Sequence, residues 1–384
     1  MISHQSLSTL GGVPLHIHQL AEALVDLGVR VDVVAPAPQM GEQGISCRFP
    51  LTTIRLSSPL ATGRAVEFCY KVHRRITERK RRPDAIHASQ WSGYIIGRHA
   101  YGAGIPVVTK FHGTMFYGAL ARIRSRELRC PAIFAEAGGA LFYLHAERTV
   151  ARNSQGLIFI SASVRREVES MTLGRIAGNS CIIYNGVDTA KFRPLDTTNL
   201  RERYGLTEED RIVLYVGRLT PTKGVSRLIL SSARLMSKYK NLKVVITGTG
   251  KHSYVTRLLT AARPRRNFIF TGWVDHDKLP EIYGLADIVV APSVYAAGNV
   301  VLEAMACAKP VIAPPGSGFA ELVRPFETGL IPDSTDIESC LAFALENNES
   351  LRRMGKNARA FAERNLSWSK TALETIEFVR AVAE

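Results

Sequence analysis

The stretch Ala291–Pro314, A-P-S-V-Y-A-A-G-N-V-V-L-E-A-M-A-C-A-K-P-V-I-A-P, decides the fold expected for this chain. It follows the apolar, β-branched run 286–290, which is typical of a strand buried on both faces of a sheet. Residues 300–307 favour a helix that Pro310 ends, and residues 311–313 predict another buried strand. A strand, a glycine loop, a short helix and a second strand indicate an α/β protein.

The start of this helix predicts an anion site. Gly298 and Asn299 let the chain turn, and the helix that Val300 opens presents unpaired N–H groups and a positive dipole end. Glu303 lies about one turn further on, where a carboxylate can accept two hydrogen bonds from a diol. A diphosphate on the amides and a ribose on Glu303 is one geometry that fits.

A second loop brings two cations. Residues 211–216 predict a strand, which Gly217-Arg218-Leu219 and then Lys223-Gly224 follow at the entry to a helix. Residues 242–247 predict a neighbouring strand, so the α/β pattern of the first half starts again. If both cations lie beside the helix start at Gly298, they would stabilise a diphosphate, and more so as negative charge builds on a leaving group. A structural role for one of the two is the alternative.

The first half offers a glycine pair and a histidine as candidates. Residues 1–3 are typical of the tail of a strand whose front half is missing, and Gly11-Gly12 then opens a helix that Gly28 ends. The glycine pair alone is equally a tight turn between strand and helix. His112 follows the strand predicted at 106–111, at the carboxyl end where open α/β sheets bind ligands, although a histidine there can also be structural.

Three patterns imitate metal or phosphate sites. His16 and His18 lie two residues apart on a helix, so they point apart. Gly248–Lys251 lacks the spacing and the hydroxyl residue of a Walker loop. Asp275-His276-Asp277 precedes a helix predicted at 278–285 and is interpreted as its cap. The sequence therefore predicts no metal site.

Composition narrows the classes of protein. The chain has 384 residues, of which 46% are hydrophobic and 22% charged, enough for two globular domains. No apolar run approaches the ~18 residues of a membrane span, and the polar N-terminus does not resemble a signal peptide. The six cysteines form no C-x-x-C pair and are interpreted as reduced and mostly buried, which favours the cytoplasm.

The formal charge of +15 has three interpretations. The charged residues can form a solvated surface, attract an anionic substrate or lipid surface, or bind nucleic acid. No zinc finger, helix-turn-helix or ribonucleoprotein motif supports nucleic-acid binding. Peripheral contact with an anionic membrane, at its inner face, is therefore a hypothesis here. The basic clusters are Arg74-Arg75, residues 79–82, and Arg122, Arg124, Arg126 and Arg129.

The chain resembles glycosyltransferase family 4, a family of retaining nucleotide-sugar enzymes with the GT-B fold. Its pattern G-R-L-x-x-x-K-G matches residues 217–224, and its N-G-V-D hinge matches residues 185–188. The family also carries a Glu, seven residues, and a second Glu followed by A-M-A-x-G-x-P-V. Glu303 matches the second Glu, whereas Tyr295 replaces the first Glu and Ala308 replaces the Gly.

The resemblance implies two Rossmann-like domains that face each other across a cleft. The acceptor-side domain is expected at 1–188 and the nucleotide-sugar domain at 189–365. A last helix, at 366–384, is expected to cross back to the first domain.

The resemblance further implies metal-independent transfer of a sugar from a nucleoside diphosphate, UDP first, to an unidentified acceptor, with retention at the anomeric carbon. The nucleotide sugar is a substrate, so no cofactor is implied. The residues assigned to catalysis are His112, Arg218 and Lys223. Those assigned to donor binding are Gly11, Gly12, Arg218, Lys223, Val274, Tyr295, Gly298, Asn299, Val300 and Glu303.

Tyr295 keeps a second hypothesis open, a degenerate glycosyltransferase-like subunit that binds a nucleotide or glycan without turnover. An epimerase of the same fold is a third. Arg218, Lys223 and Glu303 favour an active enzyme, because a chain that had lost its activity would be expected to lose them. The apolar ring of Tyr295 favours a deoxy, amino or N-acetylated donor sugar over one recognised through a carboxylate.

Overall fold

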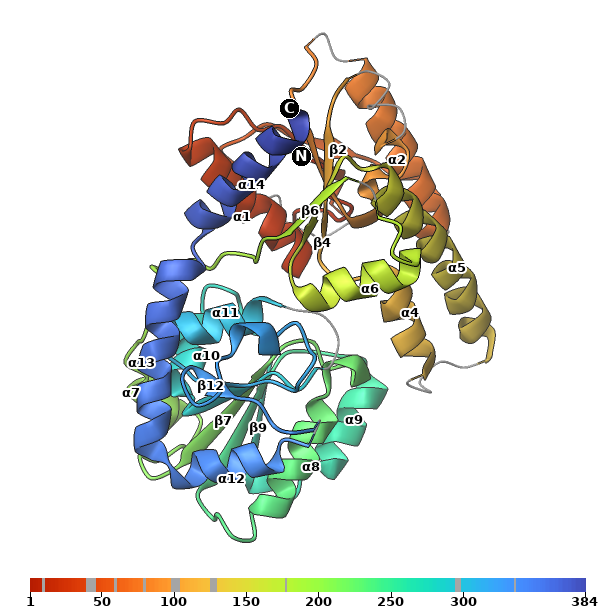
Figure 1. Cartoon of the computed structure of the whole chain (residues 1–384). Helices are drawn as coiled ribbons and strands as arrows, with labels where there is room; N and C mark the ends of the chain where they lie inside the picture. Colours follow the sequence, from red (N-terminus) through yellow and green to blue (C-terminus); the bar gives the residue numbers. More distant parts are fainter. Residues whose placement is uncertain are drawn as a thin grey trace. The chain divides into compact units, whose positions relative to one another are not determined.

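The computed structural model shows two compact units, Met1–Gly186 together with Trp368–Glu384, and Val187–Ser367 (Figure 1). Each contains parallel strands with helices on both faces. The predicted α/β architecture is therefore confirmed. The residues that the structure describes are 1–8, 11–38, 46–58, 61–78, 81–97, 104–124, 130–176, 178–293, 298–334 and 336–384.

The first unit is a parallel sheet in the order β2-β1 and β3-β4-β5-β6, bridged by Ile2, which pairs with Val34 and Ala88. Ile2 thus pairs in the parallel sense on both sides, although residues 1–3 form isolated bridges and not a strand. The strands are β1 Val33–Pro36, β2 Leu51–Ile54, β3 Ile86–Ser89, β4 Val107–Phe111, β5 Gly156–Phe159 and β6 Asn179–Ile182. The helices are α1 Gly12–Asp26, α2 Ala61–Thr77, α4 Met115–Arg124, α5 Cys130–Asn153, α6 Ala162–Thr172 and α14 Trp368–Ala383.

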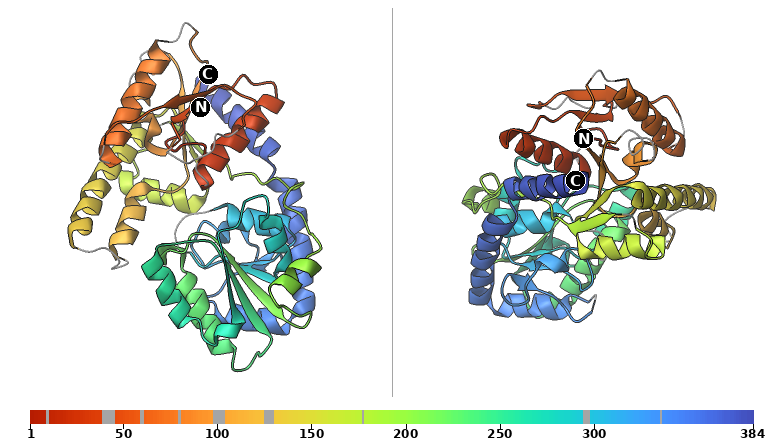
Figure 2. Two further views of the ribbon diagram at one scale, coloured as in Figure 1. Left: turned by 180° about the vertical axis from the view of Figure 1, so that it is seen from behind. Right: turned by 45° about the horizontal axis from the view of Figure 1, so that its top comes forward.

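The alternation of side chains along these strands divides the core of the first unit between two faces. Val107 packs on the face that α2 and α5 cover, whereas Val108 packs against α14. On this second face α14 lies beside α1, as Figures 1 and 2 both show. The last helix therefore belongs to the first unit, as predicted.

Close approach explains one glycine of the predicted hinge. A Cβ on Gly186 would lie 2.6 Å from the backbone nitrogen of Trp368, where α14 begins. Only glycine leaves room for the chain to pass there. The Gly of the N-G-V-D pattern is therefore required by this contact.

The second unit is a parallel sheet in the order β12-β11-β10-β7-β8-β9. The strands are β7 Arg211–Val216, β8 Leu242–Thr247, β9 Phe268–Gly272, β10 Ile288–Val290, β11 Val311–Ile312 and β12 Gly329–Leu330. The helices are α7 Thr198–Arg203, α8 Val225–Leu235, α9 His252–Ala261, α10 Leu279–Leu285, α11 Asn299–Ala306, α12 Glu338–Glu346 and α13 Asn348–Asn365. On one face Val213 and Tyr215 pack with α8 and α12.

The backbone at the end of α11 suits a glycine, the residue expected from the family pattern at position 308. Ala308 has φ of +57°, the left-handed region that glycine adopts at no steric cost. The Ala308 N–H donates to the Met305 carbonyl and the Lys309 N–H to the Ala304 carbonyl, which is a Schellman motif. The Cβ of Ala308 therefore makes this helix end strained.

We expect Ala308→Gly to raise the free energy of unfolding by about 1 kcal/mol, because it removes the strain of a left-handed alanine. The measurement is urea unfolding at equilibrium. Ala360→Gly, inside α13, is the control and should lower the same free energy by about 1 kcal/mol. A destabilised Ala308→Gly variant would contradict the strain.

The structure can be compared with the predictions made for membrane spans and for cysteine burial. Among the described residues, no helix combines the length and the apolar character that a membrane span requires. The expectation of mostly buried cysteines is partly wrong, since only two of the five thiols described are buried and the others are half-buried. The buried thiols are Cys69 and Cys307, and the half-buried ones are Cys47, Cys181 and Cys340.

Candidate functional site

The strand order of the second unit places a candidate site beyond β7 and β10. From β7 the chain proceeds outward to β8 and β9 in one direction, and from β10 to β11 and β12 in the other. The loops after β7 and β10 therefore leave in opposite directions. In open α/β sheets this switch point is where ligands bind, at the carboxyl ends of the strands.

The loop after β7 is held by backbone contacts that require glycine. A Cβ on Gly248, at φ +134°, would lie 2.0 Å from the Gly217 carbonyl oxygen. A Cβ on Gly224, at φ +73°, would lie 2.5 Å from the Pro292 carbonyl oxygen, which follows β10. The Leu219 N–H donates to the Thr249 carbonyl over 2.7 Å. The glycines thus fix the segment that carries Arg218 and Lys223.

Arg218 and Lys223 form a positive site. Arg218 is exposed and Lys223 half-buried, and neither side chain has an ion pair with a carboxylate in the part of the chain that the structure describes. Burial, and then the nearby Arg218 charge, lowers the pKa of Lys223 to about 8. Two close cations with no protein counter-ion are suited to an anionic ligand.

The N-terminus of α11 follows β10 at the same edge. Its N-cap Gly298 is extended, no side chain of the described residues caps the helix, and no acidic residue occupies its first turn. Asn299 and Val300 open the helix, so its positive dipole end remains available to an anion. Tyr295, which precedes it, lies outside the described residues.

Glu303 is enclosed by neighbouring side chains. Only 5% of the surface of Glu303 is exposed to solvent. The Tyr283 hydroxyl donates to Oε2 over 2.7 Å, and His276 Nε2 lies 3.3 Å from Oε1. Burial, reinforced by the Glu303 charge, raises the pKa of Tyr283 well above its usual value, so the phenol remains a donor. The carboxylate therefore keeps two protein partners in addition to any diol.

The interpretation of Asp275-His276-Asp277 as a helix cap is wrong. The N-cap of α10 is Lys278, and no side chain caps that helix. Asp275 instead accepts a hydrogen bond from the Asp277 N–H over 2.9 Å, while His276 reaches Glu303. An Asp side chain caps a helix only when it directly precedes the first helical residues. Here a turn separates Asp275 from the start of α10.

Val274 precedes this segment, in the loop between β9 and α10. It is half-buried, and its neighbour Trp273 is 57% exposed. Its contact with a nucleotide base stays a prediction. Among the described residues no group of His, Cys, Asp and Glu side chains is arranged to hold a metal ion.

The candidates of the first unit lie at the carboxyl edge of its own sheet. Gly11 is the extended N-cap of α1, Gly12 is the first residue of that helix, and His112 directly follows β4. The His16 ring, one turn into α1, lies 4.4 Å from the His112 ring. His18 instead faces the Ser46 carbonyl, so the two histidines of α1 do point apart.

Sequence reasoning missed the basic groups around His112. His16, His87 and Lys110 are buried, and Lys110 Nζ has no hydrogen-bond partner among the described residues. Burial lowers the pKa of Lys110 to about 7, and burial followed by the Lys110 charge lowers the pKa of His112 well below its usual value. His112 is therefore a neutral imidazole at neutral pH, able to share hydrogen bonds but not to act as a cation.

Carboxylates of neighbouring helices hold the loop that carries His112. The Met115 N–H donates to Glu147 Oε1 over 2.7 Å, and the Thr114 hydroxyl to Glu167 over 2.9 Å. Burial raises the pKa of Glu147 to about 8. Glu147 lies on α5 and Glu167 on α6, both distant from His112 in the sequence. No local sequence pattern therefore predicts these contacts.

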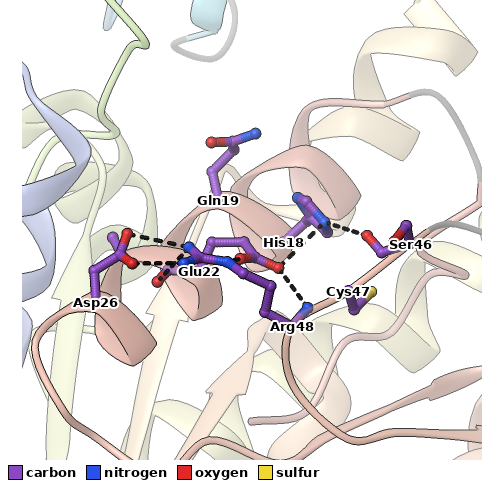
Figure 3. Close-up of a pocket in the computed structure, with 8 residues that line it drawn as sticks. His18, Gln19, Glu22, Asp26, Ser46, Cys47 and Arg48 are labelled. Carbon is purple, nitrogen blue, oxygen red and sulfur yellow. Dashed lines mark hydrogen bonds and ion pairs between the residues drawn. The ribbon is translucent and has the colours of Figure 1, made fainter.

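A hollow of about 380 Å³ beside α1 is a weaker candidate. Figure 3 shows Arg48 between Glu22 and Asp26, with which it forms ion pairs. Arg48 is therefore neutralised by carboxylates of the protein itself, which the described residues do not provide for Arg218 and Lys223. Part of the basic surface is similarly paired, since Arg74 pairs with Glu78.

Two family models match the chain in succession. The model described as Glycosyltransferase Family 4 matches residues 10–191. The model described as Glycosyl transferases group 1 matches residues 196–361. An uncharacterized glycosyltransferase of Methanocaldococcus jannaschii is 26% identical over 98% of this chain and 95% of its own length.

Solved structures share the fold. A sucrose-phosphate synthase from Thermosynechococcus elongatus superposes with a TM-score of 0.80 at 23% identity, covering 99% of this chain and 98% of that one. Anabaena HepE in complex with UDP-glucose gives a TM-score of 0.74 at 20% identity, over 99% of this chain and 98% of that one. The predicted GT-B fold is confirmed.

Proposed function

The chain belongs to glycosyltransferase family 4, and from this premise we propose that it transfers a sugar from a nucleoside diphosphate to an acceptor with retention at the anomeric carbon. UDP is the proposed nucleotide. The observation that carries the proposal is the pair Arg218 and Lys223, which has no carboxylate partner within the described part of the chain and lies at the switch point with the N-terminus of α11. HepE, a protein of the same fold, was solved with UDP-glucose.

In the proposed reaction the bond between the anomeric carbon and the diphosphate oxygen breaks. Arg218, Lys223 and the positive end of α11 bind the diphosphate and stabilise the charge that develops on it. Glu303 accepts from the ribose hydroxyls. The acceptor oxygen bonds to the anomeric carbon on the face that the diphosphate leaves. The departing phosphate oxygen takes the proton of the acceptor hydroxyl, so retention needs no protein base. Neutral His112 and the Gly11-Gly12 turn contact the transferred sugar or the acceptor.

The test is a thermal-shift panel of UDP, UMP, GDP, ADP and dTDP, followed by the sugar derivatives of the diphosphates. We expect UDP to raise the melting temperature more than UMP does, because the second phosphate adds contacts to the cations. NMR of the product then reports the anomeric configuration. Stabilisation by none of the diphosphates would overturn the proposal. Binding without hydrolysis or transfer of any sugar would instead favour the degenerate subunit.

Two fixed cations and a helix end do here what a divalent metal does in other transferases. We therefore expect turnover to persist in excess EDTA. The measurement is the initial rate with and without chelator. Complete loss of activity that manganese restores would contradict this mechanism.

A further inference from the structure

A line of hydrogen bonds connects Glu303 to the surface of the second unit. Lys191 Nζ lies 2.9 Å from His276 Nδ1 and 2.6 Å from Asp277 Oδ1. On the opposite side of its ring, His276 Nε2 lies 3.3 Å from Glu303 Oε1. Tyr283, on α10, donates to the other oxygen of the same carboxylate. His276 and Tyr283 thus meet at the Glu303 carboxyl group, and Lys191 is connected to it through His276.

The chemistry of these groups determines the direction of each bond. An ammonium group only donates, so His276 Nδ1 accepts from Lys191 and the ring carries its proton on Nε2. His276 Nε2–H therefore donates to Glu303. Each Glu303 oxygen receives one protein hydrogen bond and keeps further acceptor capacity.

Aromatic packing fixes the two donors. The His276 ring meets the Phe192 ring edge-on at 5.3 Å, and the Phe192 ring meets Tyr283 at 6.0 Å. Phe192 is 2% exposed, so it is a rigid part of the core. A carboxylate held at both oxygens by donors that cannot move has one orientation.

We propose that His276 and Tyr283 are positioning residues that aim the Glu303 carboxylate at the two hydroxyls of a ribose, so that the chain selects ribonucleoside over deoxyribonucleoside diphosphates. This inference rests on the proposed function. It gives the segment Asp275–Asp277 a role in donor recognition in place of the helix cap or the metal site that its sequence suggests.

Calorimetric titration of UDP and 2′-deoxy-UDP into the whole protein tests the proposal, with GDP and 2′-deoxy-GDP run beside them. We expect the wild type to bind the ribonucleotide at least tenfold tighter. In His276→Phe, which keeps an aromatic ring beside Phe192, this ratio should fall at least threefold while the affinity for 2′-deoxy-UDP changes less than twofold. His276→Gln, which retains an N–H donor, should restore part of the ratio.

Two further measurements separate positioning from a structural role. For His276→Phe the KM for the donor should rise while kcat stays within twofold, and the melting temperature should stay near that of His73→Phe, the same exchange on α2 of the other unit. Equal loss of affinity for both nucleotides, or an unchanged ratio, overturns the inference but leaves the proposed function standing. A wild type that binds neither nucleotide pair overturns both.

Discussion

Lys223→Ala and Arg218→Ala are each expected to lower kcat/KM for the donor at least tenfold. Each variant removes a charge-assisted contact with the diphosphate, worth about 1.5–3 kcal/mol, and that contact strengthens as the leaving group gains charge. The effect should therefore appear in kcat as well as in KM. Steady-state kinetics with the donor that the panel identifies is the measurement.

The control for these variants is Arg352→Ala, an exposed arginine on α13 that should change neither constant. Circular dichroism shows whether each variant is folded. A folded Lys223→Ala protein with wild-type kinetics would refute the assignment of the diphosphate site.

Because the pKa of Lys223 is lowered, the affinity of this site for a diphosphate should depend on pH. Below about pH 8 the lysine is charged in the free protein, whereas above it the free protein loses this proton. A bound diphosphate favours the charged form, so affinity should fall as the pH rises above about 8, by up to about tenfold per unit. In Lys223→Met this part of the pH dependence should be absent.

The sequence predicted best what depends on neighbours in the chain. β7 begins and ends where the strand predicted at 211–216 does, because Asp210 and Gly217 bound that stretch on both sides. The positive loop after it was predictable as well, although Gly224 is required there by a contact with Pro292, which is distant in the chain. The strand expected at 286–290 is shorter, and β10 comprises only its last three residues.

Contacts between distant segments could not be predicted in this way. His276 and Glu303 are 27 residues apart, and only the packing of α10 on α11 makes them partners. A local rule applied to Asp275-His276-Asp277 finds a cap, because Asp before a helix usually caps it. Similarly, Lys110 lies on an apolar strand, and only the fold brings it to His16, His87 and His112.

Glu303→Gln is expected to weaken binding of the nucleoside diphosphate at least tenfold. A carboxylate accepts at both oxygens, whereas an amide accepts at one and donates at the other, so one ribose hydroxyl loses its acceptor. Hydrogen bonds to a charged group are each worth about 1.5–3 kcal/mol, which sets the size of the loss. Calorimetric titration with UDP is the measurement.

The structure also changes what the same variant should do to stability. A Glu303 side chain that contacted only the ligand would leave the fold unaffected when it is replaced. In the structure both Tyr283 and His276 donate to it, so the amide nitrogen of a glutamine must face one of these donors. One buried donor left without an acceptor costs about 1–3 kcal/mol of unfolding free energy. Glu349→Gln, exposed on α13, should change neither binding nor stability. A Glu303→Gln protein with a much lower melting temperature and unaltered affinity for UDP would show that this carboxylate supports the fold alone.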